Sequence, residues 1–403
     1  MQSAANSSRL HGVSEKVASP KKWAGDTIHS IVTSSGDPYQ NFQTRIMYGT
    51  YQMVQKAPGG ERLTGFTRIL HRSVPDVLMR IIPTYHAWDV LKPACDGWCD
   101  YPVANRPPAI QQWITAASRN SSMLLGAWIL MLECDYVWMR PVQVPGDAYD
   151  ASVPGVQYHY DYIIPNHPDA SPWMQKLFPG GDVSTIPPSG PAPVMLRFAD
   201  WQLLGPDYVS RSAAMEADEG MKKALSWVRE MYAWDVAAAM HADTVKLVTL
   251  KSPASTLIMQ PPFDEGLGNG SLCHYTWGAL YHEGSTKGKQ IYRWEKRDFN
   301  DMKFVIDVPA IPMPPEFREG LILEFDAPLT LVRHNLVVLM LTQMNKAIAS
   351  LPNLSAELVY LDTELMPKFM EFKTKVLNER AAKVSAAAAA GATAQLSAAV
   401  TVT

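Results

Sequence analysis

The sequence predicts an α/β fold whose central sheet contains parallel strands. Residues 27–33 and 64–70 combine Ile, Val, Phe and Leu with threonines and are bounded by turn residues, which is typical of short strands. Between them, residues 39–51 carry apolar side chains at helical spacing, after the turn SSGDP at 34–38. A strand, a helix and a second strand in this order form a βαβ unit, in which the two strands pair in parallel.

The later segments extend this pattern. Apolar periodicity predicts further short strands and helices; the strands are 128–132 and 257–262, and the helices 110–117, 221–241, 328–350 and 357–383. Pro, Gly, Tyr and Asp are frequent in 141–193, which favours a loop-rich insertion, and 271–294 is predicted as a functional loop with a strand. We divide the chain into a flexible leader (1–26), a main domain (27–350), a C-terminal helix (351–383) and an Ala-rich low-complexity tail (384–403) that need not fold.

Composition excludes several classes of protein. The 403 residues are 47% hydrophobic, enough to bury a sizeable core, so a disordered chain is excluded. Lys and Arg number 36 against 39 Asp and Glu, and this net charge of −3 argues against nucleic acid as the main partner. Residues 1–26 are polar and the longest apolar run is 123–132, so we expect membrane attachment only through an anchor that is absent from this chain.

Cysteines and glycosylation sequons bear on the cellular compartment. Cys95 and Cys99 are close enough in sequence to pair, or they are two loop thiols. Four N-x-Ser/Thr sequons begin at Asn6, Asn120, Asn269 and Asn353, which gives weak support for a secretory lumen.

The strongest local feature is an acidic pair directly after the strand predicted at 128–132. Glu133 and Asp135 are two residues apart, so on extended backbone their carboxylates project to the same side. Mg²⁺ and Mn²⁺ prefer oxygen ligands and commonly bridge carboxylates to phosphates, and ligands of α/β sheets bind at the carboxyl ends of strands. The pair therefore predicts a metal that holds a nucleotide diphosphate; a solvated acidic pair at a strand end is the alternative.

Other polar residues fit such a site less specifically. His274 stands between a probable strand and a Gly turn, as a third metal ligand or as a buried histidine. Lys287 lies in a basic loop that meets phosphate or simply faces solvent, and Glu230 has aromatic neighbours. Arg68 lies inside a predicted strand, and Arg106 lies where a helix is predicted to begin. A buried Arg must be paired, so we expect each to face a phosphate, a carboxylate or a base. Serine-hydrolase, P-loop and dinucleotide-binding motifs are absent.

These motifs resemble, in the same order, those of the plant and algal hydroxyproline O-arabinosyltransferases. The resemblance covers about residues 27–300 and includes the segments IHSIVT (28–33), GFTRILH (65–71), NRP (105–107), LMLECD (130–135), WVREMYA (227–233), MQPPFD (259–264) and HYTWG (274–278). Cys134 stands where the family's acidic motif tends to have Pro, and Pro108 where the family usually has Trp. Both carboxylates of the acidic motif are kept.

The resemblance implies a GT-A type nucleotide-sugar fold over residues 27–350 and metal-dependent transfer of L-arabinofuranose from UDP-β-L-arabinofuranose to hydroxyproline in extensin-like glycoproteins. It implies that Mn²⁺ (or Mg²⁺) is held against the UDP diphosphate. It also implies that the enzyme works in the Golgi lumen or early secretory pathway. On this basis we expect the metal to be held by Glu133, Asp135 and His274, and the nucleotide and sugar side to be lined by Thr33, Arg68, Asn105 and Arg106. We expect Lys287 to neutralise phosphate as UDP departs, and Glu230 and Asp264 to contact the sugar or the acceptor.

An acceptor rich in hydroxyproline favours a polyproline II helix, which an aromatic groove binds at low entropic cost. Trp277, Tyr275 and Trp234 are the predicted walls of that groove. Two alternatives stay open. One is the related peptidyl-serine α-galactosyltransferases, which use UDP-galactose. The other is a protein of the same fold that binds the acceptor without turnover.

Overall fold

The structure is a computed structural model that describes residues 24–97 and 99–400, and of residues 386–400 the backbone alone. The leader predicted at 1–26 lies outside the described residues except for 24–26. Trp128 ties this short piece to the body, because its indole donates a hydrogen bond to the Gly25 carbonyl at 3.0 Å.

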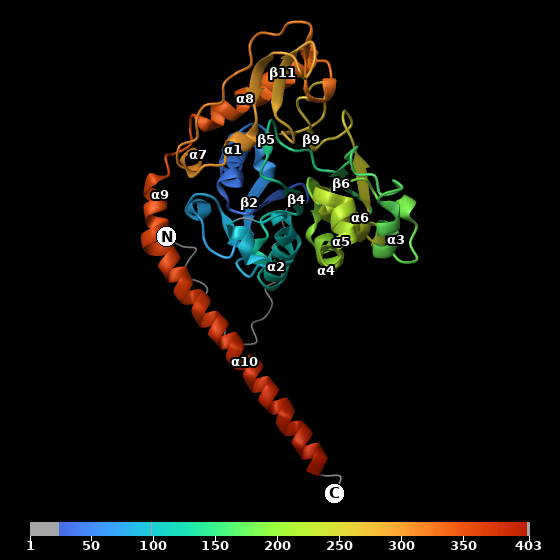
Figure 1. The fold of residues 1–403 in the computed structure, drawn as a ribbon, viewed down its shortest axis with the longest axis vertical. Helices are drawn as coiled ribbons and strands as arrows, with labels where there is room; N and C mark the ends of the chain where they lie inside the picture. The colour runs from blue at the N-terminus through green and yellow to red at the C-terminus, as the bar shows by residue number, and fades with distance from the viewer. Residues whose placement is uncertain (1–23, 98, 401–403) are drawn as a thin grey trace.

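A seven-stranded sheet forms the centre of the molecule (Figure 1), in the order β3-β2-β1-β4-β7-β6-β8. Its strands are β1 (Ile28–Ser34), β2 (Leu63–Leu70), β3 (Thr84–His86), β4 (Trp128–Leu132), β6 (Gly155–Tyr158), β7 (Val194–Arg197) and β8 (Leu247–Leu250). β1 is parallel to both β2 and β4, whereas β7 is antiparallel to β4 and β6. The predicted α/β class and the βαβ unit at 27–70 are thus confirmed.

Helices flank this sheet. α1 (Pro38–Gln55) connects β1 to β2; the Asp37 carboxylate accepts the Gln40 amide at 2.9 Å, and Pro38 fits the first turn because its missing N–H would be unpaired there. α2 (Arg106–Arg119) packs against β1 and β2. α4 (Phe198–Glu216) packs against α2 and α6 (Arg229–Met240). Because α2 begins at Arg106 and α6 at Arg229, their N-terminal turns carry side chains toward the end of β4.

Two smaller sheets build the upper part of the molecule in Figure 1. One joins β5 (Tyr136–Trp138), β10 (Leu272–His274) and β9 (Ile258–Met259). The other joins β12 (Gln290–Trp294), β11 (Ala279–Glu283) and β13 (Leu321–Ile322). With α7 (Met302–Ile306) and α8 (Leu331–Ile348) they enclose a second hydrophobic cluster, apart from the core around the large sheet.

Several segments differ from the prediction. The helix expected at 221–241 is two helices, α5 (Glu219–Leu225) and α6, because Ser226 has a φ of 48° and breaks the helical path. Residues 271–294 contain three strands instead of a loop with one. The insertion at 141–193 is loop-rich, with β6 and the short α3 (Ser171–Leu177). α4 was not predicted, although it is 19 residues long.

The C-terminal part is helical to Val400. α9 (Ser355–Tyr360) continues through a π-helical turn into α10 (Met366–Val400), which extends away from the body (Figure 1). Residues 384–400, predicted as a tail that need not fold, are part of this helix, in keeping with the high helix propensity of alanine. Arg380 anchors α10 to the body through an ion pair with Asp89 at 2.6 Å.

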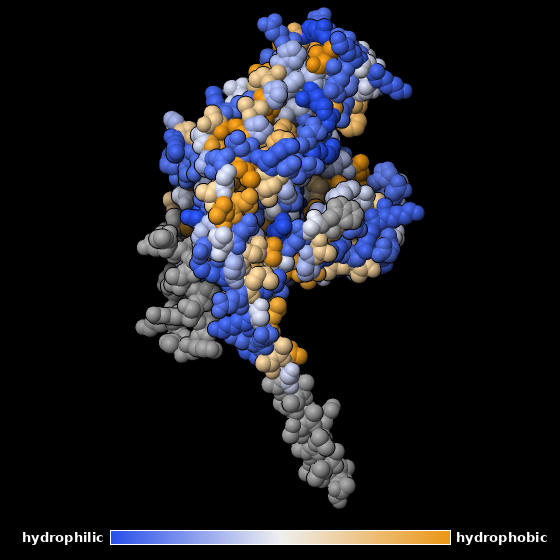
Figure 2. All heavy atoms as spheres, turned by 60° about the vertical axis from the view of Figure 1, so that its left-hand side comes forward, coloured by the Kyte–Doolittle hydropathy of each residue, from blue (hydrophilic) through white to orange (hydrophobic). Residues whose placement is uncertain are grey.

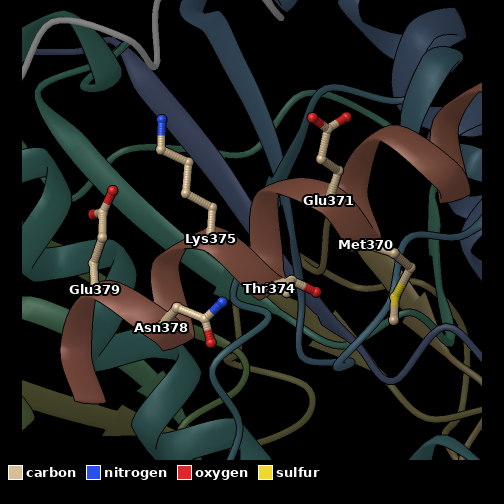
Figure 3. A pocket seen from close by; sticks show the side chains of 6 residues that line it. All are labelled: Met370, Glu371, Thr374, Lys375, Asn378 and Glu379. Carbon is tan, nitrogen blue, oxygen red and sulfur yellow. The ribbon is translucent and has the colours of Figure 1, made fainter. Parts of the chain in front are cut away.

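A hollow of about 620 Å³ borders one side of α10, and all six of its lining residues come from this helix (Figure 3). Figure 2 shows hydrophobic side chains in small patches among hydrophilic ones on the face it presents. Among the described residues, no helix combines the length and apolar character needed to span a membrane.

Candidate functional site

The carboxyl end of β4 brings together the three residues predicted to bind a metal. Glu133 and Asp135 follow β4 directly, and His274 ends β10, where it lies opposite Tyr136 in an antiparallel pair. One ligand atom from each of Glu133, Asp135 and His274 lies within 4.8 Å of the others. We call these three residues the metal cluster. The arrangement follows from the register of β5 and β10, which pair residues as far apart in the chain as Tyr136 and His274, and the local sequence does not reveal it.

Asp135 is the most enclosed member of the cluster. Its Oδ2 accepts a hydrogen bond from Lys296 Nζ at 2.6 Å and lies 3.3 Å from His274 Nε2. Burial alone would raise the pKa of this carboxyl, but the charges of Lys296 and His274 outweigh burial and hold the pKa well below its usual range. The Lys296 pKa is raised in turn, because the Asp135 carboxylate outweighs the effect of burial on the ammonium.

The donor set fits a hard divalent cation. Asp135 Oδ1 is buried and has no hydrogen-bond partner among the described residues, so a strong acceptor is left unpaired inside the cluster. Two carboxylates and one imidazole are ligands that Mn²⁺ and Mg²⁺ sites use. An unpaired buried carboxylate oxygen beside two further ligands is what a metal centre requires of the protein.

Arg106 connects the cluster to α6. Its guanidinium forms an ion pair with Glu133 and a second with Glu230 Oε2 at 3.2 Å. Tyr208 on α4 donates a hydrogen bond to the other oxygen of Glu230. Burial raises the pKa of Glu230 to about 7; Arg106 opposes that rise, and Glu133 adds to it. Glu230 and Tyr208 therefore hold Arg106, and Arg106 holds Glu133.

Three residues predicted to line the nucleotide side have different surroundings. Thr33 lies at the carboxyl end of β1, beside β4, and its buried hydroxyl has no partner among the described residues. Arg68 is fully buried and pairs with Asp76 at 2.5 Å and 2.8 Å, so its donors are used within the protein. Asn105 bonds both backbone groups of Lys92, at 3.0 Å and 3.1 Å, and so fixes a loop.

The remaining predicted residues are dispersed. Asp264 is half-buried; its carboxylate accepts the Gln260 amide at 2.6 Å, and burial raises its pKa. The Gln260 side chain reaches Thr276, which contacts His274 at 3.1 Å. Lys287 is exposed in the turn between β11 and β12, and no ion pair links it to the metal cluster.

The predicted aromatic walls need correction. Tyr275 and Trp234 are completely buried, so neither offers a ring to an acceptor. Their rings fill the two hydrophobic cores, to which the buried face of each segment points. Trp277 is half-buried and keeps part of its ring accessible.

The sequence analysis missed Lys296 and Tyr208. Lys296 follows the strand β12, and its Nζ contacts Asp135 of the metal cluster, 161 positions earlier in the chain. Tyr208 lies on the unpredicted helix α4. A buried lysine next to a strand end is a weak signal in a sequence, because nothing local distinguishes it from Lys287 or Lys289.

The model of the hydroxyproline O-arabinosyltransferase family N-terminal domain matches residues 28–247. This is more than half of the chain and includes Glu133, Asp135, Arg106 and Glu230. The chain belongs to the hydroxyproline O-arabinosyltransferase family. The resemblance that the motifs indicated is thereby confirmed.

Relatives within this family align over most of the chain. Hydroxyproline O-arabinosyltransferase 1 of Arabidopsis thaliana is 33% identical over 68% of this chain and 70% of its own length. Hydroxyproline O-arabinosyltransferase 2 of the same plant is 30% identical over 84% of this chain and 85% of its own length. The RDN1 arabinosyltransferase of Medicago truncatula is 33% identical over 67% of this chain and 71% of its own length.

Two solved glycosyltransferase structures are distant neighbours of this family member. A glycosyltransferase involved in glycosylation of the major capsid of PBCV-1 gives a TM-score of 0.32 at 11% identity, over 62% of this chain and 93% of that one. The galactosyltransferase LgtC in complex with donor and acceptor sugar analogues gives 0.31 at 9% identity, over 61% and 87%.

Proposed function

We propose that this chain is a metal-dependent glycosyltransferase of GT-A type that moves L-arabinofuranose from UDP-β-L-arabinofuranose to hydroxyproline in a hydroxyproline-rich polypeptide. The observation that carries the proposal is the metal cluster at the carboxyl end of β4, in a chain that belongs to the hydroxyproline O-arabinosyltransferase family. The carboxyl ends of the strands in a parallel sheet are where nucleotide-containing ligands bind.

Glu133, Asp135 and His274 would hold Mn²⁺ or Mg²⁺, which supplies positive charge against the diphosphate of the departing UDP. Lys296 adds a fixed ammonium at the same place, with its Nζ 2.6 Å from Asp135. We assign to Lys296 the neutralising role that we had expected of Lys287, because Lys296 is the buried cation in contact with the cluster.

The chain's other polar residues act by positioning. Arg106 fixes the Glu133 carboxylate, and Glu230 with Tyr208 fixes Arg106. Such a chain of paired groups holds a ligand in one orientation at little reorganisation cost. Thr33 and Arg106 would face the nucleotide-sugar side, and the support for Thr33 is its unpaired buried hydroxyl beside β4. Asp264 orders the segment that carries Gln260 toward Thr276.

Two features support a location in the Golgi lumen or early secretory pathway. Cys95 and Cys99 form a disulfide, a bond that persists in oxidising compartments. The sequon residues Asn120, Asn269 and Asn353 are exposed, as glycosylation acceptors must be.

The proposal is tested by incubating the purified chain with Mn²⁺ and a hydroxyproline-rich peptide, and separately with UDP-arabinofuranose and UDP-galactose. Mass spectrometry should show a pentose on hydroxyproline, and EDTA should abolish the product. A hexose on serine, or no sugar from either donor, would contradict the proposal.

The metal assignment has its own test. Asp135→Ala should abolish both transfer and Mn²⁺ binding measured by calorimetry. Asp169→Ala changes a carboxylate that is 87% exposed and is the matched control, expected to behave as the unchanged chain. Undiminished Mn²⁺ binding by Asp135→Ala would contradict the assignment.

A further inference from the structure

A line of aromatic rings leads away from the metal cluster. The Tyr136 ring lies edge-on to His274 at 4.5 Å, and the Tyr160 ring is 6.3 Å from the same imidazole. Tyr160 in turn contacts Tyr162 at 5.1 Å between ring centroids. Tyr136 and Tyr160 are buried, whereas Tyr162 is 38% exposed. The line therefore passes from the interior to the surface at Tyr162.

From Tyr162 the ring contacts continue across the protein surface. Tyr162 meets Trp277 at 6.4 Å, Trp277 meets Phe263 at 5.1 Å, and Phe263 meets Phe325 at 5.8 Å. We call these four residues the aromatic track. Trp277 and Phe263 are half-buried, and Phe325 is 75% exposed. One side of the track is therefore packed against the protein, and the other side is open to solvent.

The outer ring is held in place at a cost in backbone energy. Phe325 and Asp326 both have positive φ values, of 60° and 54°. A non-glycine residue in this region costs of the order of 1 kcal/mol or more, and such residues concentrate at functional sites. Thr286 fixes the turn, because its amide and hydroxyl donate to Asp326 Oδ1 at 2.9 Å and 3.0 Å. Core packing does not explain this backbone strain, since the Phe325 ring is largely outside the core.

Acidic side chains flank the track, and only some of them are paired with a cation. Asp161, next to Tyr162, lies 3.3 Å from Lys251 Nζ, and Glu265, near Phe263, lies 3.8 Å from Arg333. Asp264, Glu324 and Asp326 adjoin Phe263 and Phe325, and none of them forms an ion pair among the described residues. This acidic border repels an anionic ligand, and the accessible aromatic rings suit an apolar one.

We propose that the aromatic track docks a proline-rich, polyproline II segment of the acceptor polypeptide. Polyproline II helices repeat every three residues, about 9 Å, and present rigid rings that aromatic grooves bind at low entropic cost. The track's inner end adjoins the rings around His274, so a chain lying on it leads directly to the cluster. This inference rests on the proposed function, because it concerns the acceptor of that reaction.

The docking test uses decaproline, which carries no hydroxyl for transfer, in isothermal titration calorimetry with the full chain. Phe325→Ala should weaken decaproline binding about tenfold, which corresponds to about 1.4 kcal/mol. Phe325→Tyr should restore most of the affinity. Val384→Ala removes another exposed apolar side chain, 70% accessible on α10, and is the matched control, with unchanged binding.

Two further measurements separate this inference from the proposed function. The peptide KM should rise in Phe325→Ala while the affinity for UDP is kept, and decaproline binding should change less than twofold between 50 and 500 mM NaCl. If the chain transfers arabinose but Phe325→Ala leaves decaproline affinity and peptide KM unaltered, the docking inference is wrong and the function stands. If no sugar is transferred but Phe325→Ala weakens decaproline binding, the function is wrong, whereas binding of a proline-rich segment on the aromatic track stands.

Discussion

Replacing Lys296 by Met tests whether this ammonium and a divalent cation compensate the same carboxylate. Nζ lies 2.6 Å from Asp135 Oδ2, and both side chains are nearly inaccessible, at 7% and 12%. At an effective dielectric constant of about 20, the attraction is about 6 kcal/mol. Because the buried ammonium is itself desolvated, its removal recovers that desolvation cost and offsets part of the lost attraction. Removal of one partner of a buried pair therefore costs about 3–5 kcal/mol. We therefore expect Lys296→Met to lose about 3–5 kcal/mol of unfolding free energy in EDTA.

Added Mn²⁺ should recover much of this loss, because it would supply the missing positive charge. At a hundred times its dissociation constant, a ligand stabilises the folded state by about 2.7 kcal/mol. Since Lys296 occupies one Asp135 oxygen in the unchanged chain, the variant should gain more stability from Mn²⁺ than the unchanged chain does.

Urea denaturation with and without Mn²⁺ measures both quantities. Lys287→Met is the control; this exposed lysine should change stability by less than about 0.5 kcal/mol in either condition. Equal Mn²⁺ stabilisation of Lys296→Met and of the unchanged chain would refute the reasoning, because Lys296 and the metal would then not share Asp135.

Three other predictions follow from buried groups. Arg106→Met should cost about 3–5 kcal/mol by leaving Glu230 without its cation, and the double variant Arg106→Met/Glu230→Gln should recover part of the loss in urea denaturation; no recovery would contradict the pairing. Burial lowers the pKa of His29 to about 3, so below pH 6.5 the unfolded chain takes up a proton that the folded chain does not. The free energy of unfolding is therefore unaffected by His29 above pH 6.5 and falls as the pH decreases toward 3. At pH 5 the loss due to His29 is about 2 kcal/mol. His29→Gln should flatten the dependence by that amount, and an unchanged slope would count against a buried neutral imidazole. Thiol titration of the unfolded, unreduced chain should find two free thiols, Cys134 and Cys273; four would show that Cys95 and Cys99 are not paired.

The regular elements near the N-terminus were predictable because their patterns are local. β1, α1, β2 and β4 agree closely with the predicted segments, since a fully apolar run or a helical spacing of apolar residues is visible in a short window. α4 was missed because it contains Pro206 and a mixed sequence that gives no clear period. The break between α5 and α6 depends on one residue, Ser226, whose φ of 48° is imposed by its surroundings.

The candidate site was predictable to a smaller extent. The Glu133 and Asp135 pair was visible as a motif, and the family motifs added His274, which the structure brings within 4.8 Å of both. Arg68 and Asn105 belong to the same motifs, yet their polar groups are paired with Asp76 and Lys92 within the protein. A motif shows that a residue type recurs, but it does not separate a ligand from the side chain that fixes a loop.

By itself the sequence determined the α/β class, the acidic pair after β4 and the family, because each depends on residues that are neighbours in the chain or on motifs in order. Only the tertiary structure decided which lysine faces Asp135, which carboxylate holds Arg106 and which aromatic rings stay accessible. These depend on contacts between segments more than 100 residues apart. Such contacts are fixed by sheet register and helix packing and leave no signature in the local sequence.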